Sequence, residues 1–362
     1  MLAISCDSND ETASNSSAKE SPLEAYKVEL LNIAFGAASA MPVDPHIKSR
    51  SLVQEKVVKA CLELEQPERA LEYIERIDNW RRGAAFADLA LYYARYGAMK
   101  KKVETYLDRA AEVADRTEDW RRDRIRVKIA RIEAMTHQTD SFDEQMKELD
   151  RLVSTGKFDI VKNALEAYCE LYNRFYTDAE RRALIESRLK ASWSDMPISI
   201  RIELLMELAG SSIAHKDRAT ALRLVKEAGK MMDSAKWLPR FEIPLRAGLA
   251  GLRFAAGDEA PARASLQDAL DMFDVDRERI VNIDRAGILR PIAEAYQMMG
   301  DAGSAGNIYR RALEAGIENP NSRPRAEDLA ATCCSMALHG VEPDADLLSR
   351  IQKILDGLGN PW

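Results

Sequence analysis

The sequence predicts an all-α protein, an α-solenoid of about eight antiparallel helix pairs. Apolar residues recur at helical spacing, and Gly, Pro, Asp or Asn interrupts the pattern about every 12–20 residues. Ala, Leu, Arg and Glu, which favour helices, are abundant, and no long run of β-branched residues alternates with polar ones. A chain of 362 residues exceeds one ordinary core, whereas stacked repeats bury their apolar faces against their neighbours.

The chain divides into a short tail and a long helical array. Residues 1–22 are acidic and rich in Ser and Asn, with little to bury, so we expect this tail to be disordered. Residues 23–358 carry the helical pattern. The clearest helix pairs lie at 48–78, 82–112, 202–230, 243–271 and 286–315.

The pair at 286–315 shows the repeat pattern most completely. Small and aromatic residues lie at helical spacing in both halves, and a glycine separates the halves. This order resembles the tetratricopeptide repeat, although the interval between equivalent alanines is about 40 residues instead of the roughly 34 of that family. The residues that match are Ala293, Tyr296, Gly300, Ala305, Tyr309 and Ala312.

The resemblance implies a right-handed superhelix whose first helices line a concave groove that binds a partner. The chain lacks the Lys and Asn set with which some members of that family hold chaperone tails, so the resemblance does not extend to those ligands. The groove positions that the resemblance assigns are Asp88, Tyr92, Arg95, Glu203, Met206, Gly210, Arg290, Glu294 and Gln297.

A local group of basic residues is the strongest candidate for a binding site. Arg121, Arg122 and Arg124 follow one predicted helix start, and Arg81 and Arg82 follow the previous one. Cations at a helix N-terminus are disfavoured by the helix dipole, so helix stability does not explain them. An acidic peptide or another anionic surface would explain them. The alternative is that they pair with the neighbouring carboxylates Glu104, Asp108, Glu112 and Asp115.

A four-residue motif occurs twice, as Asn79-Trp80-Arg81-Arg82 and as Asp119-Trp120-Arg121-Arg122. A tryptophan at a helix start can fasten that helix to the preceding pair, which is the structural interpretation. The functional interpretation is an aromatic anchor on a binding surface.

Motifs for catalysis and for cofactor or metal binding are missing from the sequence. The four histidines lie far apart, and there is no phosphate-binding loop, dinucleotide fingerprint or nucleophile elbow. The five cysteines form no zinc pattern, and we expect Cys61, Cys169, Cys333 and Cys334 to be buried free thiols. The sequence therefore predicts neither an enzyme nor a cofactor.

The function that the sequence favours is a non-catalytic scaffold that binds a protein or a peptide. A formal charge of −7 argues against nucleic acid as the partner, and no apolar run reaches the length of a membrane span. We expect a cytoplasmic protein. One alternative is a bacterial lipoprotein anchored at Cys6, because Leu2-Ala3-Ile4-Ser5 resembles the end of a lipoprotein signal. A remote alternative is an enzyme built as an α/α-toroid.

Overall fold

The computed structural model describes residues 22–95, 100–136, 142–194 and 196–362. In these residues it has seventeen α-helices and no β-strand, so the all-α prediction is confirmed. The predicted tail and Cys6 lie outside the described residues. Within the described part of the chain, no helix combines the length and the apolar character that crossing a lipid bilayer requires.

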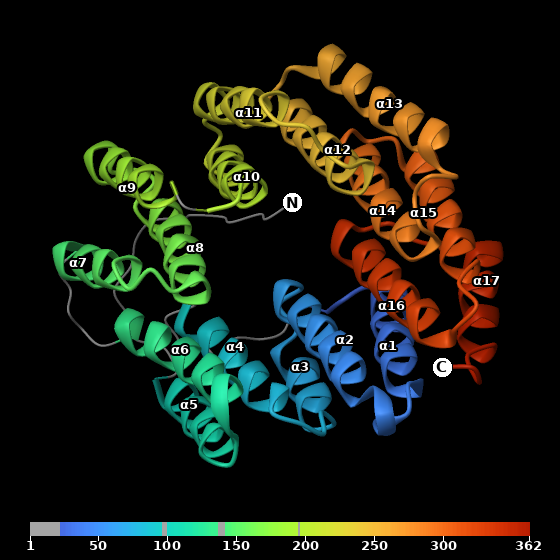
Figure 1. Ribbon diagram of the computed structural model, residues 1–362, viewed down its shortest axis with the longest axis horizontal. Coiled ribbons are helices and arrows are strands. Elements are labelled where there is room, and N and C mark those ends of the chain that lie inside the picture. The colour runs from blue at the N-terminus through green and yellow to red at the C-terminus, as the bar shows by residue number, and fades with distance from the viewer. Residues whose placement is uncertain (1–21, 96–99, 137–141, 195) are drawn as a thin grey trace. The chain divides into compact units, whose positions relative to one another are not determined.

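Figure 1 labels the helices along the chain. They fall into two compact units, and α14 contributes residues to both. The terminal unit comprises the described residues among Ser5–Gln138, Arg285–Arg290 and Gly306–Trp362. Its helices are α1 (Ala25–Ala40), α2 (Val43–Glu63), α3 (Pro67–Ile74), α4 (Arg81–Arg95), α5 (Lys100–Asp115), α6 (Asp119–Thr136), α15 (Ala302–Ile317, mostly), α16 (Ser322–His339) and α17 (Ala345–Asp356).

The middle unit comprises the described residues among Thr139–Asp284 and Pro291–Ala305. Its helices are α7 (Phe142–Val153), α8 (Phe158–Arg174), α9 (Ala179–Ser192), α10 (Ile198–Ala214), α11 (Arg218–Asp233), α12 (Pro239–Ala255), α13 (Glu259–Asp276) and part of α14 (Asn282–Met298).

Within each unit the helices pack in the manner of a solenoid. Consecutive helices form pairs, such as α4 with α5 in the terminal unit and α10 with α11 in the middle unit. The first helices of successive pairs also touch, as α2, α4 and α6 do in one unit and α8, α10 and α12 in the other. The predicted arrangement of about eight antiparallel pairs is confirmed, and α1 is an additional helix before the first pair.

Small residues allow the paired helices to approach closely. Ala221, Ala262 and Ala305 are completely buried. At Gly83 a β-carbon would lie 2.8 Å from Val113 and 3.0 Å from Ile125, so α4 needs a residue without a side chain there. Small residues also form some of the turns within pairs. Gly257 and Gly300 adopt the left-handed backbone conformation that ends the first helix of a pair.

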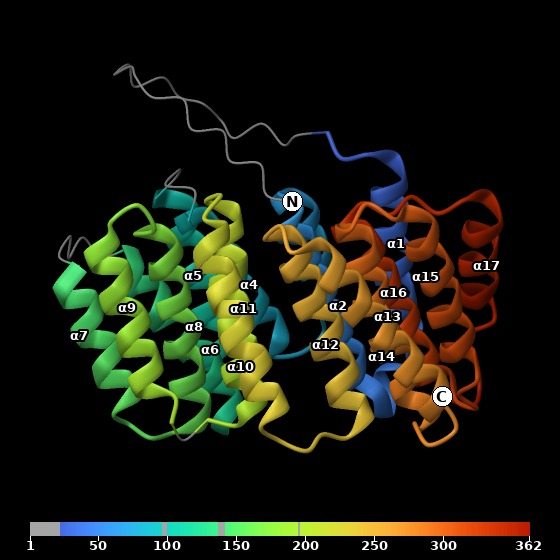
Figure 2. The same ribbon diagram turned by 90° about the horizontal axis from the view of Figure 1, so that it is seen from above.

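Helix α1 packs against α16, which lies near the other end of the sequence (Figures 1 and 2). It also touches α2 and α17. Leu30, Leu31, Ala34, Ala37 and Ala38 are each completely buried as a result. Because α1 is covered on several sides, it has no single apolar stripe, and the sequence pattern does not show what it packs against.

Candidate functional site

The two occurrences of the Trp-Arg-Arg motif lie at the starts of α4 and α6, two first helices that touch. Asn79 begins the first of these segments: its Oδ1 accepts a hydrogen bond from the backbone N–H of Arg81 at 2.9 Å. The Nδ2 of Asn79 donates to Ser51 Oγ at 2.6 Å, which ties this segment to α2. Asp119, the first residue of α6, occupies the equivalent position with φ of 58°, a left-handed conformation that costs a non-glycine residue about 1–2 kcal/mol.

The tryptophan rings of the two motifs meet edge to face. Their centroids are 5.5 Å apart at an interplanar angle of 77°. Arg124 lies over the ring of Trp80 at 5.9 Å and Arg121 over the ring of Trp120 at 5.3 Å. Trp120 keeps 57% of its surface exposed. We call Trp80, Trp120, Arg121 and Arg124 the tryptophan edge.

A buried ion network lies beneath this edge and joins α2, α4 and α6. Glu55, whose side chain is 5% exposed, pairs with Arg81 and also with Lys128 at 3.6 Å. Lys128 donates to both carboxylate oxygens of Asp88 at 2.7 Å. All four side chains are largely removed from solvent, so this network is internal.

The predicted basic group is therefore divided between the interior and the surface. Arg81 has its charge balanced by Glu55. Arg122 pairs with its neighbour Asp123 at 3.6 Å on the surface. Arg121 and Arg124 each lie over a tryptophan ring, and neither forms an ion pair among the described residues. Arg82 is half-buried at the start of α4. Of the four carboxylates weighed as partners from the sequence, Glu104 pairs with Lys100 at 3.9 Å and Asp115 with Arg126 at 2.9 Å.

The groove positions that the tetratricopeptide resemblance assigns are distributed over both units and have different surroundings. Asp88 belongs to the buried network, and Tyr92 lies edge to face with Tyr93 at 5.4 Å. Arg95, at the end of α4, is exposed. Arg290 pairs with Asp328 of α16 at 3.3 Å inside the terminal unit. The remaining groove positions, Glu203, Met206, Gly210, Glu294 and Gln297, belong to the middle unit and are partly exposed.

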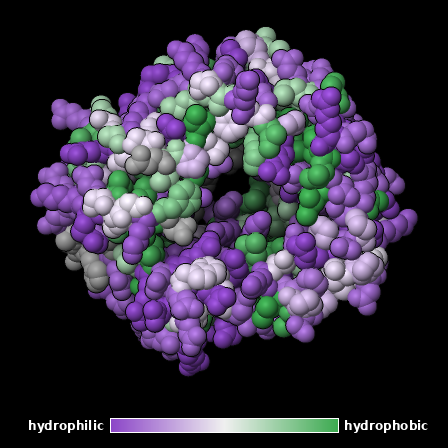
Figure 3. All heavy atoms as spheres, viewed as in Figure 1, coloured by the Kyte–Doolittle hydropathy of each residue, from purple (hydrophilic) through white to green (hydrophobic). Residues whose placement is uncertain are grey.

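A feature that the sequence analysis missed is the exposure of large apolar residues where first helices begin. In the middle unit, Leu238 and Phe241 at the start of α12 are 58% and 48% exposed. Val281 and Ile283 at the start of α14 are 55% and 46% exposed. Most side chains visible in Figure 3 are hydrophilic, and hydrophobic ones form patches among them. Helical periodicity does not reveal these residues, because they lie at or just inside the helix ends.

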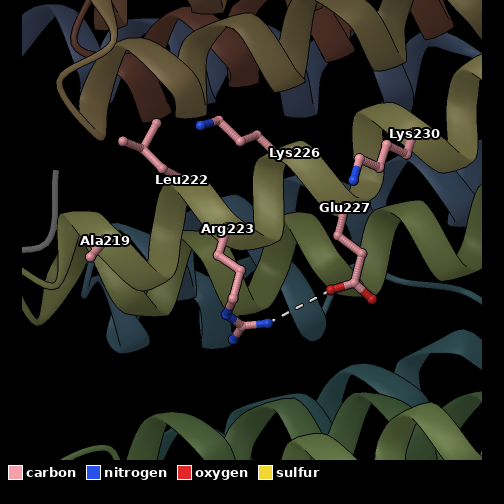
Figure 4. Close-up of a pocket in the computed structure, with 6 residues that line it drawn as sticks. All are labelled: Ala219, Leu222, Arg223, Lys226, Glu227 and Lys230. Carbon is pink, nitrogen blue, oxygen red and sulfur yellow. Dashed lines mark ion pairs between the residues drawn. The ribbon is translucent and has the colours of Figure 1, made fainter.

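A concavity of about 600 Å³ along α11 is lined by four charged and two apolar side chains (Figure 4). Arg223 pairs with Glu186 of α9 at 2.7 Å and with Glu227 at 3.7 Å. Lys190 pairs with the same two carboxylates at 2.8 and 2.7 Å. These charges satisfy one another and stabilise the contact between two second helices. The residues that line the concavity are Ala219, Leu222, Arg223, Lys226, Glu227 and Lys230.

This ion lattice predicts a pH dependence of folding stability. Burial alone would raise the pKa of Glu186, but hydrogen bonds from Arg223 and Lys190 outweigh it and lower the pKa below 4.5. The stabilisation is therefore present above pH 4.5 and is lost as the pH falls through the lowered pKa. We expect Glu186→Gln to lower the free energy of unfolding by about 1–2 kcal/mol at neutral pH. Urea denaturation at a series of pH values measures this difference, which should shrink below pH 4.5.

The more exposed pair of Glu314 with Arg350 provides the control for that prediction. Glu314→Gln removes the same charge from a side chain that is 47% exposed, so we expect a change of less than about 0.5 kcal/mol. A constant difference between wild type and Glu186→Gln across the acid range would contradict the assignment.

The buried cysteines offer no reactive thiol. Cys61, Cys169, Cys333 and Cys334 are free and buried, as predicted. Burial raises the pKa of the Cys334 thiol to about 12, and the nearby Glu63 adds to the effect. A thiol with so high a pKa stays protonated and is a poor nucleophile. Among the described residues, no three His, Cys, Asp or Glu side chains gather in a way that could hold a metal ion.

Comparisons with known proteins assign no family to the chain. No protein-family model matches it, and no curated protein matches it. One solved structure with a similar fold is described as a circular tandem repeat protein with novel repeat topology and enhanced subunit contact surfaces. It shares 16% sequence identity over 91% of this chain and 94% of that chain, with a TM-score of 0.31. At that score the similarity carries no inference about function.

Proposed function

We propose that this chain is a non-catalytic scaffold that binds a protein or peptide partner at the exposed starts of its first helices. The observation that carries the proposal is the exposure of large apolar side chains at these starts. In the terminal unit they are Val43 and Trp120, and in the middle unit Phe158, Leu238, Phe241, Val281 and Ile283.

The folding of the chain does not account for these residues. Leu238 and Val281 occupy the N-cap positions of α12 and α14, and neither makes a side-chain capping hydrogen bond. Ser, Thr, Asp or Asn at an N-cap stabilises a helix by about 1 kcal/mol relative to such apolar residues. Their exposure also means that they bury little area in the core. Apolar residues that are costly for the fold and exposed to solvent are typical of partner-binding surfaces.

Two neighbouring helix starts in the middle unit are held together. Arg240 beside Leu238 pairs with Asp284 beside Ile283 at 3.6 Å. The same guanidinium lies over the ring of Phe241 at 4.7 Å. The ion pair of Arg240 with Asp284 thus lies beside the exposed apolar residues of α12 and α14. Apolar residues with polar ones around them are typical of protein-binding patches.

Selection of peptides from a displayed random library on the immobilised full chain tests this proposal. The affinity of an enriched peptide is then measured by calorimetry for wild type and for the Leu238→Ser/Val281→Ser double variant. We expect wild type to enrich a defined consensus and the double variant to lose about tenfold or more in affinity. Because serine is a good N-cap, the double variant should be at least as stable as wild type, which separates lost binding from unfolding.

Leu184→Ser is the matched control, because Leu184 is 41% exposed on the second helix α9 and not at a first-helix start. It should leave peptide affinity unchanged. The proposal is wrong if no peptide is enriched, or if Leu184→Ser weakens binding as much as the double variant does.

A further inference from the structure

We infer that the tryptophan edge of the terminal unit binds an acidic peptide segment of the partner. Arg121 and Arg124 take its carboxylates, and the exposed indole of Trp120 takes an apolar side chain between them. This inference rests on the proposed scaffold function and adds the chemistry of the partner.

The first step is the electrostatic state of the two arginines. Both guanidiniums lie against tryptophan rings, and neither has a carboxylate partner among the residues that the structure describes. Stacking on an indole leaves the N–H groups at the edge of a guanidinium able to donate. By contrast, Arg81 and Lys128 have their charges balanced by Glu55 and Asp88. The edge therefore presents two oriented cations of the kind that bind carboxylates through paired hydrogen bonds.

The second step is that folding does not explain the arrangement. Arg121 and Arg124 lie near the start of α6, where the helix dipole disfavours positive charge. Asp119, immediately before Trp120, adopts an unfavourable left-handed backbone conformation. Trp120 nevertheless remains more than half exposed. An exposed aromatic ring flanked by arginines is the composition of a binding hot spot.

The third step distinguishes a peptide from a single-stranded nucleic acid, which also binds aromatic and basic surfaces. Asp119 and Asp123 lie next to the arginines in the sequence, so cations and carboxylates alternate along this segment. A nucleic acid carries a negative charge at every phosphate and would place more of them near these carboxylates than a peptide with spaced acidic residues does. The ring of Trp80 already contacts Arg81, Arg124 and the edge of Trp120, so the two tryptophans do not offer parallel faces for successive bases. Isolated carboxylates spaced along a peptide fit this arrangement better.

Fluorescence anisotropy of a labelled synthetic peptide, titrated with the full chain at low ionic strength, tests the inference. The probe is a peptide of about a dozen residues in which Glu and Asp alternate with Phe and Leu. Its neutral counterpart carries Gln and Asn instead. We expect the acidic peptide to bind at least about tenfold more tightly than the neutral one. Arg121→Glu/Arg124→Glu should weaken binding of the acidic peptide at least about tenfold.

Arg122→Glu/Arg126→Glu is the matched control, because it makes the same change in charge on the same helix. Both residues are exposed and pair with Asp123 and Asp115, and neither lies over an aromatic ring in the described part of the chain. We expect this variant to change the affinity by about twofold or less. Circular dichroism checks that both variants keep the helical content of wild type.

Three outcomes would overturn the inference. The neutral peptide binds as tightly as the acidic one, or the two double variants weaken binding equally, or a single-stranded oligothymidylate displaces the peptide at lower concentration. If the acidic peptide fails while library-selected peptides still bind, the acidic-segment inference is wrong and the scaffold function stands. If no peptide of either kind binds, both are wrong.

Discussion

Replacing Glu55 by alanine is expected to lower the free energy of unfolding by about 3–5 kcal/mol. The side chain of Glu55 is 5% exposed, and its carboxylate forms an ion pair with Arg81, whose side chain is 13% exposed. Lys128 would retain Asp88, but Arg81 would keep its charge in a desolvated position, near the ring of Trp80 and without the carboxylate of Glu55. Urea denaturation followed by circular dichroism measures the change.

Glu104→Ala is the control for the Glu55 variant, because Glu104 is 60% exposed and pairs loosely with Lys100 at 3.9 Å. It should change the free energy of unfolding by less than about 0.5 kcal/mol. A Glu55→Ala protein as stable as Glu104→Ala would show that the network beneath the tryptophan edge contributes nothing net.

Replacing Phe35 by alanine should lower the free energy of unfolding by a similar amount, about 3–5 kcal/mol. The ring of Phe35 is 1% exposed and stacks on Tyr73 with centroids 4.1 Å apart. Arg76 covers it at 4.7 Å. The substitution loses the free energy gained by burying the aromatic ring, and the cavity that it leaves adds a further cost. Because α1 packs against α16, we also expect faster amide hydrogen exchange in α16, measured by mass spectrometry.

The same substitution at Phe158, which is 49% exposed at the start of α8, is the control. We expect it to cost less than about 1 kcal/mol and to leave exchange in α16 unchanged. If Phe35→Ala accelerates exchange in α1 alone, the contact between α1 and α16 does not stabilise the two helices together.

The fold was predictable where a helix has one apolar face and ends at a glycine or polar turn that the sequence shows. The pair at 286–315 illustrates this, because Ala305, Tyr309 and Ala312 are all completely buried. The helix pair at 202–230 was also predicted, although Lys216, in the turn after α10, occupies the left-handed position that glycine holds elsewhere. The packing of α1 on α16 was not predictable, since a helix covered on several sides has no periodic signal to read. Membership of the tetratricopeptide family stays a prediction.

The candidate site was predictable only in part, because ion pairing and exposure depend on residues of neighbouring helices. The repeated Trp-Arg-Arg motif directed attention to the starts of α4 and α6, because a basic group at a helix start conflicts with local propensity. That this segment binds a partner stays a prediction. The sequence did not show that Arg81 forms a buried ion pair while Arg121 forms none among the described residues. The partner of Arg81 is Glu55, which lies on a different helix pair. Leu238 and Val281 were missed because exposure at a helix end depends on how neighbouring helices terminate.

The contact between α1 and α16 also sets an order for folding during synthesis. α1 is synthesised before the helix that covers it, which follows about 280 residues later, so its core contacts are among the most non-local in the described residues. Most of the middle unit, by contrast, is one continuous segment whose helices contact near neighbours in sequence. It can assemble while the apolar faces of α1 and α2 are still incompletely covered. The nascent chain therefore exposes part of those faces until α16 has been synthesised, and they are the surfaces that a chaperone would need to protect.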